Sequence, residues 1–342
     1  MKSLSFFQKI IFIINLGFTL LLLFSYIVPY FFSQKFPELS LFSLLLPFLL
    51  LVNIVFFLFW TVQRKKQVFL PLLAIIVGYS HLSRLVQFSK QKPQNKDGFS
   101  VMSFNVRLFN HYLWHPNPNL SQQILDFISE KQPDILLIQE FYGNKKYEPS
   151  SSIYPYKKII YKGRKDKIGQ AFFSKFPIIS SGSLDFPNTA NNGSFADVII
   201  QNDTIRLYNL HLESLHLDPE KSKILNENSK ELVKNLGKRF ALQHQQTQIF
   251  KNHYLQSPYK SIVCGDFNNT AFSNIYQEIK GDLLKDSFEE AGFGIGKTFH
   301  FKYFPFRIDF ILPHKTFSVH KHETFNDGLS DHLPVMAVLS LN

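Results

Sequence analysis

The chain has 342 residues, of which 45% are hydrophobic, and its formal net charge is +11. Residues 1–96 hold ten Lys and Arg against one Glu, and residues 97–342 hold 27 Lys and Arg against 25 Asp and Glu. The basic excess therefore does not indicate a nucleic-acid-binding stripe on the larger part, where the run from Lys157 to Lys167 is equally typical of a solvated loop. The single cysteine, Cys264, excludes an intramolecular disulfide.

Three apolar stretches dominate the first quarter of the chain: Ile10–Phe32, Leu39–Val62 and Val68–Leu85. The first two are uncharged and, with 23 and 24 residues, are long enough to cross a hydrocarbon core of roughly 30 Å. The third is shorter. A cleaved signal peptide is the alternative for the first stretch, but a signal core has only about 7–15 apolar residues. Residues 1–85 are therefore predicted to form about three transmembrane helices in contact with a lipid bilayer.

The basic residues near these stretches bear on the orientation of a multi-pass membrane protein. Arg64, Lys65 and Lys66, between the second and third stretches, favour a cytoplasmic loop and a C-terminal part on the outer, exoplasmic side. Arg84 and the lysines that follow it favour the reverse. We expect the outer side.

Residues 86–98 are polar, contain Pro93 and Gly98, and are predicted to be a linker to a domain over residues 99–342. Helices are expected over Leu120–Lys131, which has an apolar face, and over Asp218–Gln256, as one or two helices broken near Gly237. Strands are expected over Ser100–Asn105, Asp134–Gln139, Tyr156–Tyr161, Gln170–Phe173, Phe195–Ile200, Ile205–Leu210, Lys260–Cys264, Ile308–Leu312 and Val335–Leu339, the fifth and sixth as a hairpin. The pattern predicts an α/β (α+β) domain of two packed sheets with helices outside.

Polar residues follow several of these apolar runs. In Gly265-Asp266-Phe267-Asn268, alternation along an extended chain would point Asp266 and Asn268 to the same side, where they could hold a water and a phosphoryl oxygen. The alternative is an ordinary turn after a strand. Asn105, Glu140 and His211 end three other runs. Since active sites gather at strand ends, we expect one shared site.

A second segment, Ser330-Asp331-His332, lies just before the last predicted strand. Asp309 lies within an apolar strand, where a carboxylate needs a partner, and His332 would serve. That pairing would fix the imidazole tautomer and raise its pKa. A structural Asp309 satisfied by backbone donors is the alternative. Carboxylates and amides without thiolates favour Mg²⁺ or Mn²⁺ as the metal.

Six short motifs occur in the order seen in the endonuclease/exonuclease/phosphatase family, and residues 99–342 resemble that deoxyribonuclease-like family. They are Phe104-Asn105-Val106, Ile138-Gln139-Glu140, Asn209-Leu210-His211-Leu212-Glu213, Gly265-Asp266-Phe267-Asn268, Arg307-Ile308-Asp309-Phe310 and Ser330-Asp331-His332-Leu333-Pro334. The resemblance implies a four-layered α/β sandwich with the site at one edge of the two sheets.

The resemblance also implies roles for the motif residues. Glu140 would be the main metal ligand, with Asn105 assisting and Asp331 nearby. Asp266 and Asn268 would orient the attacking water and the phosphate, which His211 would contact, while His332, held by Asp309, would stabilise the developing charge. Arg107 departs from the pattern, because several members of the family have an acidic residue there, and this makes a second metal less expected.

The sequence thus favours a membrane-anchored, divalent-metal-dependent phosphoesterase that hydrolyses a phosphodiester or phosphomonoester by in-line attack of water. The substrate could be lipid-linked. One alternative is a Mg²⁺-dependent endonuclease or exonuclease acting on DNA or RNA. Another is an inactive, membrane-tethered binding module.

Overall fold

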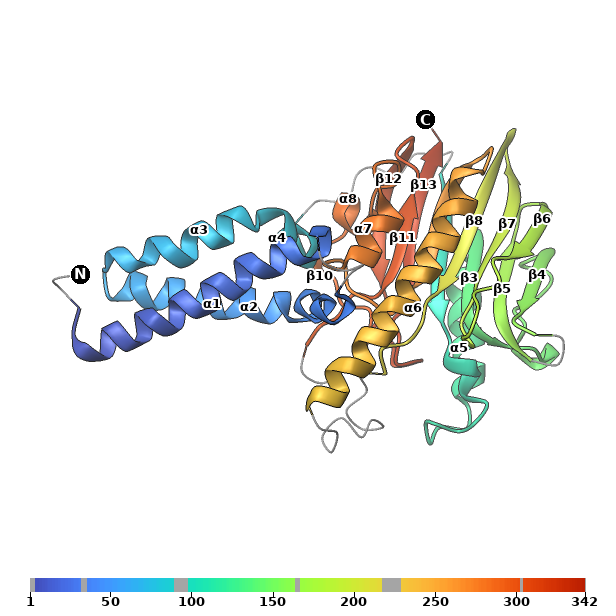
Figure 1. The fold of residues 1–342 in the computed structure, drawn as a ribbon. Helices are drawn as coiled ribbons and strands as arrows, with labels where there is room; N and C mark the ends of the chain where they lie inside the picture. The colour runs from blue at the N-terminus through green and yellow to red at the C-terminus, as the bar shows by residue number, and fades with distance from the viewer. Residues whose placement is uncertain are drawn as a thin grey trace.

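A bundle of N-terminal helices projects from one side of a two-sheet domain (Figure 1). The computed structural model describes residues 4–31, 36–88, 98–163, 167–216, 229–301 and 304–341. Most of the predicted linker and residues 218–228 of the predicted helical stretch lie outside these ranges. At the start of the predicted linker, Val86 and Gln87 form the short strand β1.

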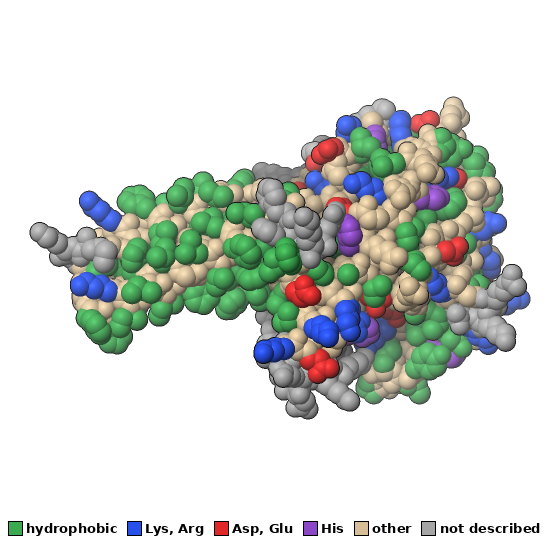
Figure 2. Space-filling view, in the orientation of Figure 1, with side chains coloured by type: hydrophobic (Ala, Val, Ile, Leu, Met, Phe, Trp, Pro, Cys, Tyr) green, Lys and Arg blue, Asp and Glu red, His purple; other side chains and the backbone are tan. Residues whose placement is uncertain are grey.

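The bundle consists of α1 (Phe6–Phe31), α2 (Leu41–Val62), α3 (Phe69–Val77) and α4 (Tyr79–Leu85), with short 3₁₀ helices at Pro37–Ser40 and Lys66–Val68. Among the described residues, two helices are long and apolar enough to cross a membrane, or up to three spans result if the bent pair α3 and α4 counts as one. Hydrophobic side chains cover the visible face of the bundle (Figure 2). The bundle therefore presents to its surroundings the apolar surface that a bilayer requires.

The predicted third span is bent by 66° between α3 and α4. The break falls at Gly78, where a Cβ atom would lie only 1.9 Å from the hydroxyl oxygen of Tyr26. The Tyr26 hydroxyl also donates a hydrogen bond to the carbonyl oxygen of Ala74, at 3.3 Å. The glycine thus lets α1 pack closely against the bend.

Polar side chains inside the bundle connect α1 to α2. The amide of Asn15 donates to the hydroxyl of Thr19 (3.1 Å), which donates to Asn53 Oδ1 (2.8 Å), and the indole of Trp60 donates to Asn15 Oδ1 (3.0 Å). All four side chains are buried. Because each of them has a hydrogen-bond partner, the network fixes how the two helices pack without leaving a polar group unpaired in an apolar setting.

The domain contains two mixed sheets, with strand orders β12-β13-β2-β3-β5-β4 and β11-β9-β8-β7-β6, and a short ribbon of β1 with β10. The remaining helices are α5 (Leu120–Lys131), α6 (Ser229–Leu255), α7 (Asn274–Lys280) and α8 (Ser287–Ala291). The strands are β1 (Val86–Gln87), β2 (Phe99–Asn105), β3 (Ile135–Tyr142), β4 (Tyr156–Tyr161), β5 (Ile168–Ser174), β6 (Ile178–Ser183), β7 (Gly193–Ile200), β8 (Asp203–His211), β9 (Lys260–Asp266), β10 (Gly294–Ile295), β11 (Asp309–Pro313), β12 (Phe317–Thr324) and β13 (Val335–Leu341).

Three apolar clusters order the domain into four layers. Inward residues of both sheets, such as Val101, Leu137 and Leu207, form the central core. The apolar face of α5 packs on the outside of the six-stranded sheet, and α6 and α7 pack on the outside of the five-stranded sheet (Figure 1). The predicted fold, a sandwich of two sheets with outer helices preceded by apolar helices, is confirmed.

Several predicted elements match the structure, whereas the helix predicted after Asp218 differs in one respect. The helix over Leu120–Lys131 and the hairpin of β7 with β8 are present. The predicted break near Gly237 is wrong, because α6 runs without interruption from Ser229 to Leu255. A Cβ atom at Gly237 would lie 2.8 Å from Cγ of Glu38, so this glycine leaves room for the 3₁₀ helix Pro37–Ser40 that precedes α2 and does not end α6.

The bundle is docked on the domain by polar and apolar contacts. Arg307 forms a buried ion pair with Asp286 (2.6 Å) and donates to the carbonyl oxygen of Arg84, at 3.3 Å. Arg84 in turn lies 3.7 Å from the Glu289 carboxylate. At the other end of the junction, the Thr270 hydroxyl donates to the carbonyl oxygen of Ser43 at 3.5 Å, which places the first turn of α2 next to the loop after β9.

Candidate active site

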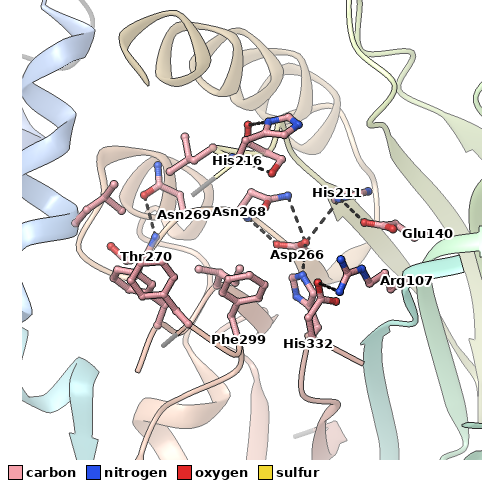
Figure 3. A pocket seen from close by; sticks show the side chains of 17 residues that line it. Arg107, Glu140, His211, His216, Asp266, Asn268, Asn269, Thr270, Phe299 and His332 are labelled. Carbon is pink, nitrogen blue, oxygen red and sulfur yellow. Dashed lines mark hydrogen bonds and ion pairs between the residues drawn. The ribbon is translucent and has the colours of Figure 1, made fainter. Parts of the chain in front are cut away.

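The predicted site residues come together at one edge of the two sheets (Figure 3). Strands β2 and β3 run parallel, as do β8 and β9, so the residues at their carboxyl ends meet at one edge. Asp309 is the first residue of β11 and pairs directly with Asp266 across the ladder. A shared cavity of about 310 Å³ is lined by Glu140, His211, Asp266, Asn268, Asp331 and His332. Asn105 and Asp309 lie behind it, hydrogen-bonded to Asp266 and His332 respectively.

Asp266 occupies the centre of the cluster and is only 1% exposed. Its carboxylate accepts hydrogen bonds from the Asn105 amide (3.0 Å) and from the backbone N–H of Asn268 (2.8 Å). Burial raises the pKa of Asp266 to about 6, against the attraction of His332. The carboxylate is therefore placed to accept a proton near neutral pH.

Asn268 reaches the same side as Asp266, as predicted, but through a turn. Strand β9 ends at Asp266, and Asn268 adopts φ 48°, a left-handed conformation that asparagine tolerates better than most residues. Its amide donates to Asp266 Oδ2 (3.3 Å) and to the carbonyl oxygen of Leu212 (2.9 Å). Gly265 has φ 134°, and a Cβ atom there would lie 1.9 Å from the carbonyl oxygen of Leu210. The glycine permits the close approach of β8 that brings His211 to Asp266.

Glu140 does not end its strand, as its place after an apolar run suggested, but lies within β3. The pairing of β3 with β5 shifts register between Ile138 and Phe141, and Glu140 has φ 50° in this bulge. Bulges re-aim side chains next to active sites, and here the Oε1 atom of Glu140 lies 3.3 Å from the Asn105 amide nitrogen. Burial raises the pKa of Glu140.

His211 lies between the two carboxylates. Its Nε2 atom is 3.7 Å from both Glu140 Oε1 and Asp266 Oδ2. Burial lowers the pKa of His211, against the attraction of Asp266. A neutral imidazole with a free N–H can donate to an oxygen of a ligand in the cavity.

His332 is held by Asp309. The Nδ1 atom of His332 is 3.1 Å from each carboxylate oxygen of Asp309, and its Nε2 atom is 3.6 Å from Asp266 Oδ2. Burial disfavours the imidazolium, but the carboxylates of Asp309 and Asp266 outweigh it and raise the pKa of His332 well above its ordinary value. The Phe299 ring packs beside it at 4.9 Å between centroids. The imidazole is therefore a fixed positive group at the cavity floor.

Asp331 was expected near a metal, and the structure pairs it with Arg107, at 2.7 Å. The Arg107 guanidinium also lies 4.0 Å from the ring centroid of Trp114. Residues 107–110 all have φ between 44° and 56°, a left-handed turn that costs roughly 1–2 kcal/mol per residue. Buried Phe109, stacked on Tyr147, and the hydrogen bonds of Asn110 offset this cost. The strained turn thus fixes a cation next to Asp331.

A buried network of polar side chains lies beneath the site and was not predicted from the sequence. Gln139 donates to Asn209 Oδ1 (2.7 Å) and to Ser103 Oγ (3.1 Å), and Gln170 donates to the Asn209 carbonyl oxygen at 2.8 Å. Gln139 precedes Glu140, and Asn209 lies two residues before His211, so amides inside apolar strands were the available signal. The network connects β3, β5 and β8 between the sheets and holds the backbone from which these two site residues project.

The donor set fits a hard divalent cation. Glu140 and Asp266 are carboxylates joined by the Asn105 amide, with burial raising both pKa values, and oxygen donors suit Mg²⁺ or Mn²⁺. Ligating atoms of Asp266, Asp309 and His332 also lie within 4.8 Å of one another. In that trio, however, the protonated imidazole of His332 already satisfies Asp309. This favours the Glu140 side as the second candidate place for a cation.

Comparison with known proteins agrees with this geometry. Residues 102–332 match the profile of the Endonuclease/Exonuclease/phosphatase family, and residues 8–85 match that of a domain of unknown function (DUF8431). No curated protein sequence matches the chain.

Three solved structures illustrate the structural similarity. An endonuclease/exonuclease/phosphatase from Bacteroides vulgatus is 20% identical and has a TM-score of 0.55, with 72% of this chain and 99% of that chain covered. The human Nocturnin catalytic domain with bound sulfate is 17% identical at a TM-score of 0.55, covering 76% and 100%. A mannosyl-6-phosphatase from Bacteroides thetaiotaomicron is 19% identical at 0.51, covering 71% and 100%. At these identities the similarity establishes the fold.

Proposed function

The chain belongs to the endonuclease/exonuclease/phosphatase family, and we propose that it is a membrane-anchored, divalent-metal-dependent phosphoesterase. The observation that carries the proposal is the convergence of polar residues from β2, β3, β8, β9, β11 and the loop before β13 on one cavity. Such a cluster of buried carboxylates, histidines and amides is costly unless it is used.

The residues of the cavity suggest a division of labour for in-line hydrolysis. Asp266, oriented by Asn268, accepts a proton from the attacking water, and His211 donates to a phosphate oxygen. His332, positioned by Asp309, stabilises the charge that develops on the phosphate. Glu140 and Asn105 would hold a divalent cation, with Asp331 close by. When bound, such a cation supplies neutralisation of phosphate charge as a Lewis acid.

The arrangement of the bundle supports an outward-facing domain. The Gln8 amide donates to Gln63 Oε1 at 3.4 Å, so the start of α1 and the end of α2 lie together, far from the domain. Lys9 and the basic residues 64–66 are at this end, which the positive-inside tendency places in the cytoplasm. Arg84, which favoured the opposite orientation, lies beside the Glu289 carboxylate. We therefore place the bundle across the membrane and the catalytic domain on the exoplasmic side.

A nuclease acting on DNA or RNA is the second candidate, because the family includes nucleases. The basic run that could have bound a phosphate backbone begins on β4, the edge strand of the six-stranded sheet, and the described lysines of this run do not line the cavity. Residues 164–166 of the run are outside the described part of the chain. An inactive binding module is a third reading, and it predicts no metal-dependent turnover.

The test is hydrolysis of bis(p-nitrophenyl) phosphate and p-nitrophenyl phosphate by the detergent-purified full chain with Mg²⁺ or Mn²⁺. Asp266→Asn and His332→Ala should each abolish turnover. Asp197→Asn, a buried carboxylate paired with Arg206 away from the cavity, and His320→Ala on β12 are the matched controls and should retain it. Unchanged turnover in both site variants would overturn the assignment, as would the absence of metal-dependent turnover in the wild-type chain.

A further inference from the structure

The cavity of the candidate active site has a charged floor and a wall that includes several apolar side chains. Figure 3 shows Phe299 beside the floor residues Asp266 and His332. The floor holds the carboxylates and histidines already described. The wall contains the apolar side chains Leu44, Leu215, Phe299, Phe301, Phe306 and Ile308, and beside them Ser214, His216, Asn269 and Thr270. A phosphate group needs the floor alone, so the wall is suited to an apolar part of the same ligand.

Leu44 connects the cavity to the helical bundle, because it belongs to α2, one of the helices long and apolar enough to span a membrane. The 19 residues from Leu44 to Val62 are separated by 18 steps of about 1.5 Å, a rise of about 27 Å that is close to the roughly 30 Å of a hydrocarbon core. Arg64, Lys65 and Lys66 come after Val62 and the single residue Gln63. If the basic residues lie at one membrane surface, Leu44 lies at the opposite edge of the hydrocarbon. The cavity therefore borders the bilayer.

The position of the wall is fixed by the packing of the bundle against the domain. Leu44 packs with Leu215, Leu236 and Phe240, and the neighbouring Ser43 accepts the hydrogen bond of Thr270. Apolar contact thus continues from Leu215 of the domain onto Leu44 of α2, beside the polar contact of Thr270 with Ser43. A hydrocarbon chain leaving the cavity over Leu44 would enter the bilayer.

The charge of the lining argues against a nucleic acid. Among the described residues that line the cavity, Arg107 is the one Lys or Arg, and it is paired with Asp331. Binding a nucleic-acid backbone requires several cations that neutralise successive phosphates. The lining offers instead one phosphate-sized polar floor and an apolar exit.

We propose, on the basis of the phosphoesterase function above, that the substrate is a lipid phosphoester presented by the adjacent leaflet. Its phosphate occupies the floor and the proximal part of its apolar chain lies on the wall, leading over Leu44 into the membrane. A cavity of about 310 Å³ is at the lower end of the roughly 300–1,000 Å³ of small-molecule pockets, so it holds a headgroup while the chains remain outside. Water adds to phosphorus, the phosphorus–oxygen ester bond breaks, and the leaving oxygen takes a proton.

The experiment compares lipid and soluble substrates in one preparation. The full chain is reconstituted in nanodiscs with Mg²⁺ and assayed on dioleoyl phosphatidate and dioleoyl phosphatidylglycerol. Glycerol 3-phosphate, glycerophosphoglycerol, bis(p-nitrophenyl) phosphate and a single-stranded oligonucleotide are the comparison substrates. We expect at least one lipid to be hydrolysed with a kcat/KM more than tenfold above that of its soluble headgroup.

Leu44→Gln and Phe301→Ser should each lower the ratio of lipid to soluble turnover by about tenfold, as removing apolar contact from a pocket does. Using a ratio separates loss of the wall from partial loss of folded protein. Leu45→Gln is the matched control, because Leu45 is the next residue of α2 and is 39% exposed outside the cavity lining. It should leave the ratio unchanged.

The outcomes separate the substrate class from the chemistry. Cleavage of bis(p-nitrophenyl) phosphate or the oligonucleotide without preference for lipid would overturn the lipid proposal and leave the phosphoesterase intact. The same conclusion would follow if the lipid preference persisted in both wall variants. No metal-dependent turnover of any substrate would overturn the proposed function itself, and the lipid proposal with it.

Discussion

Replacing Asp309 by Asn is the sharpest test of the site, because it changes charge while keeping side-chain size. Asp309 does not line the cavity and touches His332 through two oxygens at 3.1 Å. We therefore expect it to act as a positioning residue, through the imidazole. The variant leaves His332 in place beside a neutral amide.

The magnitude follows from the contact that is lost. A hydrogen bond to a charged group contributes about 1.5–3 kcal/mol, and each 1.36 kcal/mol corresponds to a factor of ten in rate. Asp309→Asn should therefore lower kcat by about 10- to 150-fold, with a smaller change in KM. Both side chains are less than one tenth exposed, so solvent screens little of this effect.

The assay is steady-state hydrolysis of bis(p-nitrophenyl) phosphate between pH 6 and 10 by wild type, Asp309→Asn, His332→Asn and the double variant. Carboxylates raise the pKa of His332, so removing one should move the high-pH limb of the kcat profile to lower pH. The double variant should be no slower than His332→Asn, because Asp309 acts through that residue. Wild-type kcat in Asp309→Asn, or fully additive effects in the double variant, would refute the reasoning.

Other changes test different parts of the molecule. Arg107→Met removes the positive charge beside Asp331 and near Glu140. Because this charge would repel a bound cation, the Mg²⁺ concentration for half-maximal activity should fall several-fold. An unchanged or higher Mg²⁺ requirement would argue against a cation site there. Asn53→Leu breaks the network within the bundle and should lower the unfolding free energy by about 1 kcal/mol in a detergent titration without changing kcat; equal stability would contradict the hydrogen bonds. Burial lowers the pKa of His322 from 6.5 to about 4, so this residue costs the wild type on the order of 3 kcal/mol of stability as pH falls from 6.5 to 4. His322→Gln should lose less stability over that range in denaturant titrations, and parallel curves would exclude this role for the histidine.

The sequence predicts the sheets best where apolar runs are bounded by turn-forming residues. The strand over Tyr156–Tyr161 and the helix over Leu120–Lys131 have the predicted bounds for this reason. Strand β12 was missed because His320, Lys321 and His322 interrupt its apolar pattern. Strand β6 was missed because half of it is serine, and its side chains are only partly buried or exposed.

The site residues could be proposed because each lies next to an apolar run in the sequence, but their geometry depends on contacts remote in sequence. The bulge that turns Glu140 is a property of the pairing of β3 with β5 and has no signature within β3 alone. Likewise, Gly237 suggests a helix break from sequence alone, whereas in the structure it makes room for Glu38, which is remote in sequence. The contribution of Leu44 to the cavity wall depends on docking between segments more than 160 residues apart.

The pairing of β13 with β2 has a consequence for how the protein is made. Val335 pairs with Ser103, 232 residues earlier, and β13 lies between β12 and β2 rather than at an edge. Contacts of such high sequence separation form slowly, because a long loop must close before they contribute. The Ser330 hydroxyl, which bonds the carbonyl oxygen of Asn105, and His332 arrive with this strand. During synthesis the sheet therefore keeps an open edge, and the candidate active site stays incomplete, until the last described strand inserts.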